Sequence, residues 1–245
     1  MKRLFVIGCS YTSWREGKCY GSSYPALIAQ QYPDWQVYDA SEPGSSNDSA
    51  FFRLQHLERT YGKPDKIIIQ WTHLGRTNLV LSYKHIPRSY NWKTSDNYLS
   101  LEKYDPDDNI STSTTITSTS FVNKSTGRRI HEKHLSDISL MSKLQLSKYY
   151  SWFLHTETLY WNTYKEILLI NGVYGEDRVL TFDWHNWYHP GAKFNMPSNW
   201  IGNVQDALGD KFKSLSIDDA QHYGSAGHRA VYNWLDINLN EFLAQ

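Results

Sequence analysis

The stretch that decides the fold is "PDKIIIQWT", residues 64–72. Its three consecutive isoleucines form a β-branched run, which is typical of a strand buried on both faces. A second apolar run, "RLFVIG" at residues 3–8, ends at a glycine, and between the two lies the alternating stretch "WQVYDAS" at residues 35–41. Three strands are therefore predicted within the first 72 residues.

The segments between these strands have helical spacing. We predict one helix over residues 22–32 and another over 50–61, with Asn47 or Ser49 as the cap of the second. Strand, helix, strand, helix, strand is the pattern of right-handed βαβ units and a parallel sheet. The prediction is a single domain over residues 1–245, of the α/β class, with three layers and a mostly parallel sheet.

The regular pattern stops in the middle of the chain. We predict an insertion at about 82–135, which contains the low-complexity run "STSTTITSTS" at 111–120. The insertion is either a long excursion or a small β-rich subdomain, and it serves as a lid or binding loop or is a solvated segment without function.

Regular patterns return after this insertion. Helical spacing over residues 140–171 predicts one long helix or two, with Gly172 as the terminator. A strand is predicted over 178–184, a short helix over 199–210, and a final helix within the last stretch, 224–245.

Composition excludes several classes of partner. Lys and Arg together number 25, and so do Asp and Glu, so no basic field favours nucleic-acid binding. No run approaches the ~18 apolar residues of a membrane span, so we expect no membrane partner. The opening "MKRLFVIGC" mimics a lipoprotein signal, but its apolar segment is too short, and we expect a cytoplasmic protein.

No cofactor or metal is predicted. The sequence contains no glycine-rich phosphate loop, no dinucleotide fingerprint and no zinc-type Cys/His spacing. His185 and His189 stand four apart beside Asp183, but Pro190 and nearby aromatic residues favour a loop over a metal-binding helix. The number of subunits stays open.

Three residues supply the groups that a nucleophilic hydrolase needs. Ser10 follows the first predicted strand, and Asp219 and His222 precede the final helix. A serine hydroxyl needs a base to remove its proton, and an imidazole needs a carboxylate to fix its tautomer. Taken singly, each residue is equally well explained as a turn, capping or surface residue.

The arrangement of these residues resembles the SGNH, or GDSL-type, hydrolase family along the whole chain. The resemblance rests on the Gly8-Cys9-Ser10 turn, on Gly44 in "PGSSN", and on the Asp219-x-x-His222 motif. It implies a flavodoxin-like three-layer α/β/α fold. It also implies that Ser10 is the nucleophile, His222 the general base and then acid, Asp219 its orienter, and the N–H groups of Ser10 and Gly44 oxyanion donors.

The third block of the family departs from the pattern. A Gly-x-Asn-Asp motif is expected after the third strand, where this chain has "IIIQWTHLGR". His73, or alternatively Thr72, stands in the place of the oxyanion-binding asparagine, and Asn47 is a second candidate donor. Arg76 follows and is either an anchor for an anionic substrate group or a surface residue.

The resemblance implies a serine esterase or acylhydrolase that cleaves a small ester through an acyl-enzyme. A carbohydrate O-acetyl ester is one candidate substrate, because ten Trp, eighteen Tyr and nine Phe offer platforms for sugar rings. The alternative is a non-catalytic binding or structural protein with an eroded oxyanion hole, similar to SGNH-like chains of phage and marine bacterial genomes.

Overall fold

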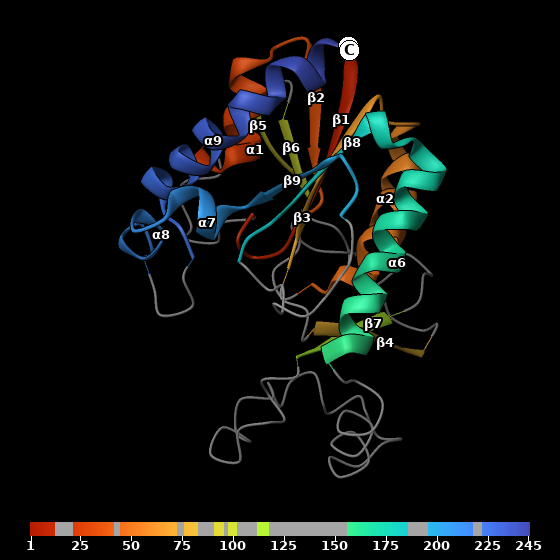
Figure 1. The fold of residues 1–245 in the computed structure, drawn as a ribbon. Coiled ribbons are helices and arrows are strands. Elements are labelled where there is room, and N and C mark those ends of the chain that lie inside the picture. Colours follow the sequence, from red (N-terminus) through yellow and green to blue (C-terminus); the bar gives the residue numbers. More distant parts are fainter. Residues whose placement is uncertain are drawn as a thin grey trace.

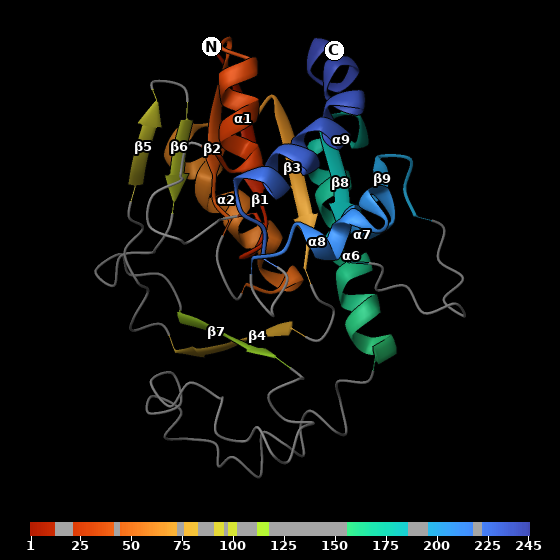
Figure 2. The ribbon, with the colours of Figure 1, turned by 90° about the vertical axis from the view of Figure 1, so that its left-hand side faces the viewer.

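A seven-stranded sheet forms the centre of the molecule (Figures 1 and 2). The computed structural model describes residues 1–12, 22–41, 45–72, 76–82, 91–95, 98–101, 112–117, 156–185, 196–217 and 222–245. In spatial order the strands of the sheet are β5 (Asn91–Ser95), β6 (Tyr98–Leu101), β2 (Trp35–Asp39), β1 (Lys2–Ile7), β3 (Lys66–Trp71), β8 (Val179–Asp183) and β9 (Trp200–Asn203). All neighbours pair in parallel except β5 and β6.

The central strands are buried as the isoleucine run predicts. β1 lies between β2 and β3, with Val6 opposite Asp39 on one side and Ile68 on the other. Every residue of β3 and β8 is buried, because helices cover both faces of a parallel sheet. The predicted α/β class with a mostly parallel sheet is confirmed.

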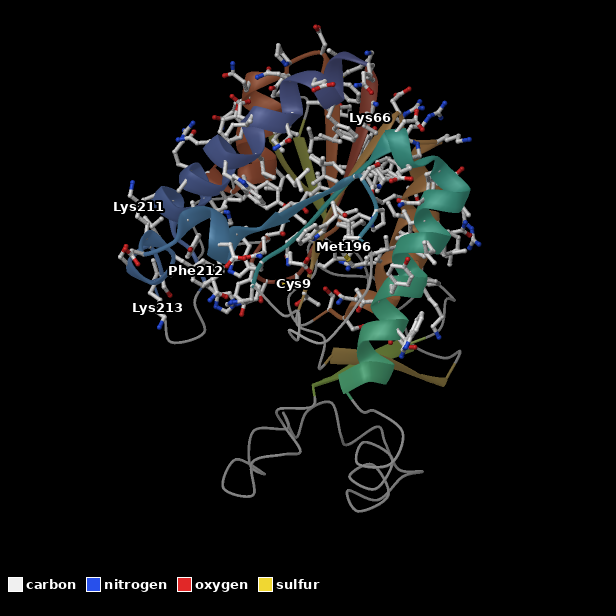
Figure 3. All side chains as sticks on the ribbon, viewed as in Figure 1. Cys9, Lys66, Met196, Lys211, Phe212 and Lys213 are labelled. Atoms are coloured by element: carbon white, nitrogen blue, oxygen red, sulfur yellow. The ribbon has the colours of Figure 1, made fainter. Side chains whose placement is uncertain are left out.

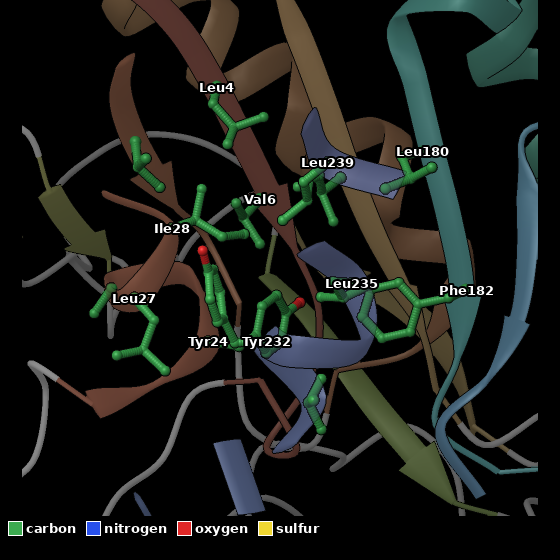
Figure 4. Close-up of a cluster of buried hydrophobic side chains, with 14 of the residues drawn as sticks. Leu4, Val6, Tyr24, Leu27, Ile28, Leu180, Phe182, Tyr232, Leu235 and Leu239 are labelled. Atoms are coloured by element: carbon green, nitrogen blue, oxygen red, sulfur yellow. The ribbon is translucent and has the colours of Figure 1, made fainter. Parts of the chain in front are cut away.

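Helices cover both faces of this sheet (Figure 1). α1 (Tyr24–Gln31) and α9 (Ser225–Ala244) lie on one face, and α2 (Ala50–Tyr61) and α6 (Thr156–Tyr174) lie on the other. The short helices α7 (Val204–Leu208) and α8 (Lys211–Ser214) follow β9, while the 3-10 turns η2 (Asn47–Ser49) and η3 (Glu176–Arg178) precede α2 and β8. One apolar cluster fills each helix–sheet interface. Figure 4 shows the α1–α9 cluster, in which side chains of both helices meet Leu4 and Val6 of β1.

The strand order places a functional site. The chain leaves β1 and β2 toward opposite faces of the sheet, so a crevice is expected outside the carboxyl ends of β1 and β3. Ser10 follows β1, Asn47 follows β2 and Thr72 follows β3, so the three lie at the same edge.

Three local predictions were wrong. α6 does not end at Gly172 but continues to Tyr174, and the chain leaves the helix at Gly175, whose φ is +93°. Within 199–210, the first part is strand β9 and only the second part is helix α7. Ser49 precedes α2 without capping it through its side chain, because its hydroxyl donates to the Ser46 carbonyl.

The region of the predicted insertion contains strands. β4 (Arg76–Ser82) pairs antiparallel with β7 (Thr112–Thr117) in a small separate sheet. The β5–β6 hairpin instead extends the main sheet beyond β2 (Figure 2). Strand β4 thus lies outside the main sheet from Arg76 on, and most of the predicted insertion at about 82–135 lies outside the described residues. The single-domain organisation stays a prediction.

None of the helices in the described part of the chain combines the length and the apolar character needed to cross a membrane.

Candidate active site

Ser10 and His222 face each other at the carboxyl edge of the sheet. The distance between Ser10 Oγ and His222 Nε2 is 2.9 Å, although the residues are 212 positions apart in the sequence. Both side chains are partly buried, and His222 lies just before α9. This geometry lets the imidazole accept the serine proton as the oxygen attacks an electrophile.

Gly8 is required by a close approach in the turn that delivers Ser10. A Cβ atom at Gly8 would lie 2.2 Å from Thr12 Oγ1 and 3.0 Å from Ser41 Oγ. The Gly8 carbonyl accepts hydrogen bonds from Arg53 Nη1 at 2.8 Å and from Ser45 Oγ at 3.0 Å. The turn is therefore packed and bonded from the β2 side of the sheet.

Cys9, labelled in Figure 3, is fully buried. Its backbone N–H donates to Gln70 Oε1 at 3.2 Å, and its thiol donates to the same oxygen at 3.4 Å. The Cys9 carbonyl accepts from the Thr12 N–H at 3.0 Å. These contacts hold Cys9 in the core, and Ser10 is the candidate nucleophile of the turn.

Gln70 organises a buried polar network beneath the turn. Its Oε1 also accepts from Thr12 Oγ1 at 3.0 Å, and this hydroxyl contacts the Tyr24 hydroxyl at 3.1 Å. The Gln70 amide nitrogen donates to the Trp71 carbonyl. Burial raises the pKa of Tyr24 well above its usual value, so its hydroxyl stays protonated.

The backbone N–H of Ser10 has no acceptor among the described residues. By contrast, the neighbouring Gly8 carbonyl and Cys9 N–H both have partners. The Ser10 N–H is therefore available to an oxygen of a bound ligand, as an oxyanion donor must be.

Asn47 holds two segments together. Its Oδ1 accepts from the Thr72 N–H at 2.7 Å, and its Nδ2 donates to the Thr72 carbonyl at 3.1 Å and to Thr163 Oγ1 at 2.9 Å. An amide nitrogen has two hydrogens, and both have acceptors here. These contacts correct the prediction that Asn47 offers a donor to the oxyanion. They show a clamp between η2, the end of β3 and α6.

An aromatic wall backs the imidazole of His222. The Tyr11 ring lies 5.2 Å from the His222 ring and stacks on Trp184 at 5.0 Å between centroids. His185 meets the edge of Tyr11, and Tyr223 packs against Trp184. Since Tyr11, Trp184, His185 and Tyr223 are all buried, they shield one side of the base from water.

His228 is a structural histidine of α9. Its Nδ1 accepts a hydrogen bond from the Tyr24 N–H at 3.4 Å. This N–H lies in the first turn of α1, so it has no acceptor within the helix. Burial, and to a lesser extent the neighbouring His222, lowers the pKa of His228 to about 3. The ring is therefore neutral at physiological pH and supports the packing of α1 on α9.

Several predicted site residues lie outside the described residues. These are Gly44, His73 and Asp219, and the side chain of Arg76 is likewise not described. His189 is also outside, and the described residues contain no cluster of three potential metal ligands.

Sequence reasoning missed two residues that hold the nucleophile turn, Arg53 and Gln70. Gln70 carries a signal that points to it, because it is the single uncharged polar residue in an otherwise apolar strand end, "IIIQW". Arg53 carries none, because a lone arginine in an amphipathic helix is most simply explained as a solvated side chain.

The sheet order and the two helical layers define a three-layer α/β/α fold. The fold is similar to that of the psychrotrophic esterase EstA from Pseudoalteromonas sp., in a structure inhibited by monoethylphosphonate. This likeness covers 100% of both chains, with a TM-score of 0.51 and 10% sequence identity. The two proteins thus share a fold at low sequence identity.

A second similar structure is TesA, with a TM-score of 0.42 and 12% identity over 98% of this chain and 99% of that one. No family model matches the sequence. No curated protein matches it either.

Proposed function

We propose that this chain is a serine hydrolase that cleaves a small carboxylic ester. The observation that carries the proposal is the 2.9 Å contact between Ser10 Oγ and His222 Nε2, at the edge of the sheet where α/β folds bind ligands. The esterase named in the structural comparison has the same fold, which adds support at the level of the class.

In the first half-reaction Ser10 Oγ attacks the ester carbonyl carbon while its proton passes to His222 Nε2. The carbonyl π electrons move to the oxygen, and the Ser10 N–H donates to this oxyanion. When the tetrahedral intermediate collapses, the bond to the alcohol breaks and His222 returns the proton to the leaving oxygen. The products are the free alcohol and an acyl ester on Ser10.

In the second half-reaction water attacks the acyl-enzyme. His222 removes a proton from the water, and the second tetrahedral intermediate collapses with release of the carboxylic acid. The proton on His222 then returns to Ser10 Oγ, which restores the starting state.

Asp219 is proposed as the orienter of His222. It stands three residues before the histidine, and the Ile217 N–H donates to the His222 carbonyl at 2.9 Å. This hydrogen bond ties both ends of the short segment that contains Asp219, which supports the assignment. Gly44 and His73 are proposed as further oxyanion donors on the family resemblance.

A carbohydrate O-acetyl group is the proposed substrate within this class. The aromatic content of the chain and the habit of the resembled family support it. A synthetic acetyl ester therefore matches the proposed acyl group while leaving the alcohol open.

A second candidate function is a non-catalytic SGNH-like binding protein. The observation that favours it is the full engagement of the Asn47 amide nitrogen with Thr72 and Thr163, which removes one candidate donor from the oxyanion hole. The loss of one such donor costs about 10²–10³ in rate in known hydrolases.

The test is hydrolysis of p-nitrophenyl acetate by the wild-type protein and Ser10→Ala. We expect a Ser10-dependent release of p-nitrophenolate that falls by roughly 10³-fold or more in the variant. Ser214→Ala is the matched control, because this exposed serine lies in α8 and donates only to the Lys211 carbonyl. Equal rates for wild type and Ser10→Ala would refute the hydrolase and favour the non-catalytic candidate.

A further inference from the structure

Arg53 is a cation buried beneath the nucleophile turn. It is the fourth residue of α2, its side chain is 3% exposed, and its Nη1 donates to the Gly8 and Ala40 carbonyls at 2.8 Å each. Gly8 follows β1 and Ala40 follows β2, so one guanidinium group ties the carboxyl ends of two neighbouring strands.

The positive charge of Arg53 is not explained by these two bonds. Burial of a charge is costly unless the charge is paired, and a neutral amide can donate to two carbonyls equally well. Within the described part of the chain Arg53 forms no ion pair, and its buried Nε has no hydrogen-bond partner. The charge therefore calls for a second role.

An acidic side chain, Glu166, partly offsets the positive charge of Arg53. Arg53 lowers the pKa of Glu166, but burial has the larger effect and the resulting pKa is about 7. Burial therefore weakens the negative charge that Glu166 carries near neutral pH. The positive charge of the Arg53 guanidinium, on the α2 side of the turn, is therefore only partly offset by Glu166.

Negative charge develops close to the Arg53 guanidinium during ester cleavage. The oxyanion forms beside the Ser10 N–H, two residues from the carbonyl that Arg53 holds. In an interior that excludes water, a fixed charge acts on a nearby anion far more strongly than it does in solvent. A cation beside the oxyanion would offset the asparagine donor that is absent from "IIIQWTHLGR".

Resting on the proposed function, we propose that Arg53 is the positioning residue of the nucleophile turn. It fixes the Gly8 carbonyl so that the Ser10 N–H stays open to the substrate oxygen, and its charge favours the oxyanion at that place. The role belongs to the transition state, so it acts on kcat more than on KM.

The test compares Arg53→Lys, which keeps the cation, with Arg53→Gln, which keeps a donor and loses the charge. With p-nitrophenyl acetate we expect kcat to fall by less than about 10-fold in Arg53→Lys and by about 10²-fold in Arg53→Gln, with KM nearly unchanged. Arg59→Gln is the matched control on the exposed side of the same helix and should keep the wild-type kcat. Thermal unfolding establishes that each variant is folded.

Equal kcat values for the Lys and Gln variants would overturn the role of the charge. If Arg53→Gln does not fold, Arg53→Lys decides alone, because it retains the cation. A folded Arg53→Lys protein whose kcat is no higher than that of Ser10→Ala also overturns the proposal. A kcat of Arg53→Lys well above that background, with the wild-type KM, supports it.

A wild-type protein without Ser10-dependent turnover would refute the proposed function instead. In that case hydrogen exchange measured by NMR tests the positioning by Arg53. Faster exchange of the Cys9 amide in Arg53→Gln, or in Arg53→Lys if the former does not fold, supports it when the Ile68 amide in β3 is unchanged. Unchanged exchange of the Cys9 amide overturns it.

Discussion

Gly8 is tightly packed, whereas Gly172 has open space around it. A Cβ atom at Gly8 would overlap Thr12 Oγ1 at 2.2 Å, whereas a Cβ atom at Gly172, in α6, meets nothing within 4 Å. The first glycine is required by packing, and the second only weakens a helix.

Substitution by alanine should separate the two. We expect Gly8→Ala to lower the free energy of unfolding by about 1–3 kcal/mol through overpacking, and to reduce the reaction of Ser10 with p-nitrophenyl acetate. Gly172→Ala should raise the free energy of unfolding by about 0.5–1 kcal/mol, because alanine is the better helix former. Urea denaturation measures both, and a stabilised Gly8→Ala protein would contradict the described packing of the turn.

The sequence predicts the Ser10–His222 pair but not the residues that hold it. Ser10 and His222 stand in recognisable motifs, so their meeting at 2.9 Å follows from the family resemblance. The bonds of Arg53 to Gly8 and of Gln70 to Cys9 join residues 45 and 61 positions apart. No local pattern encodes such contacts, because they depend on which faces of α2 and β3 meet.

At the scale of elements, α6 supplies the acceptor that the start of α2 lacks. Glu166 Oε2 accepts from the Phe51 N–H at 3.2 Å, where the preceding Ser49 side chain gives no cap. Burial raises the pKa of Glu166 from 4.5 to about 7, and Asp48 also raises it, while the Phe51 N–H, Arg53 and Lys165 act in the opposite direction. The contact between the two helices is therefore sensitive to pH.

The sign of this effect follows from proton binding. Between pH 4.5 and 7 the folded protein holds a proton on Glu166 that the unfolded chain has released, so stability from this group falls as pH rises through that range. We expect Glu166→Gln to remove this part of the pH dependence, which is at most about 3 kcal/mol, and to make the protein relatively more stable at pH 8. Urea denaturation at pH 5 and pH 8 measures it.

Glu241→Gln is the control, since this glutamate is exposed on α9. If both variants keep the same pH slope as the wild type, Glu166 is not the group responsible.

The success of element prediction varied with the strength of the local pattern. α2 begins and ends at the predicted residues, because its apolar spacing is clear and Gly62, with φ +85°, terminates it. The segment 199–210 was misread because Trp200 and Ile201 fit a strand and a helix equally over so short a length. β9 forms there through pairing with β8, which no local pattern reveals.

At the scale of the whole molecule, two apolar clusters share one sheet. Leu54 of α2 belongs to one cluster and Leu235 of α9 to the other, and β1 contributes side chains to both. Neither helical layer can be lost without exposing one face of the same strands. This arrangement favours one cooperative unfolding transition.

Core truncation in each layer tests this and, with it, the predicted single domain. We expect Leu54→Ala and Leu235→Ala each to cost about 2–5 kcal/mol and to shift one common transition, seen alike by circular dichroism and tryptophan fluorescence. A variant that loses only part of the signal in a separate early transition would indicate two independent units.

The core of the fold was predictable, and its periphery was not. The alternation of strands and helices in the first 72 residues indicates a parallel sheet, since β1, β2 and β3 are joined by helical crossovers. The β5–β6 hairpin joins this sheet through pairs such as Val37 with Tyr98, which are far apart in sequence. Polar Ser/Thr-rich composition around it carries no period that reveals such pairing.

The separation of Ser10 and His222 by 212 residues links chemistry to folding. Ser10 follows the central strand β1, and His222 precedes α9, which packs against the sheet. In a chain in which α9 has not docked, the Ser10 hydroxyl therefore lacks its base. On the proposed function, turnover would then require the complete native state. The rate of ester hydrolysis would then be proportional to the fraction of fully folded molecules. Refolding could be measured by the recovery of this rate, without a spectroscopic label.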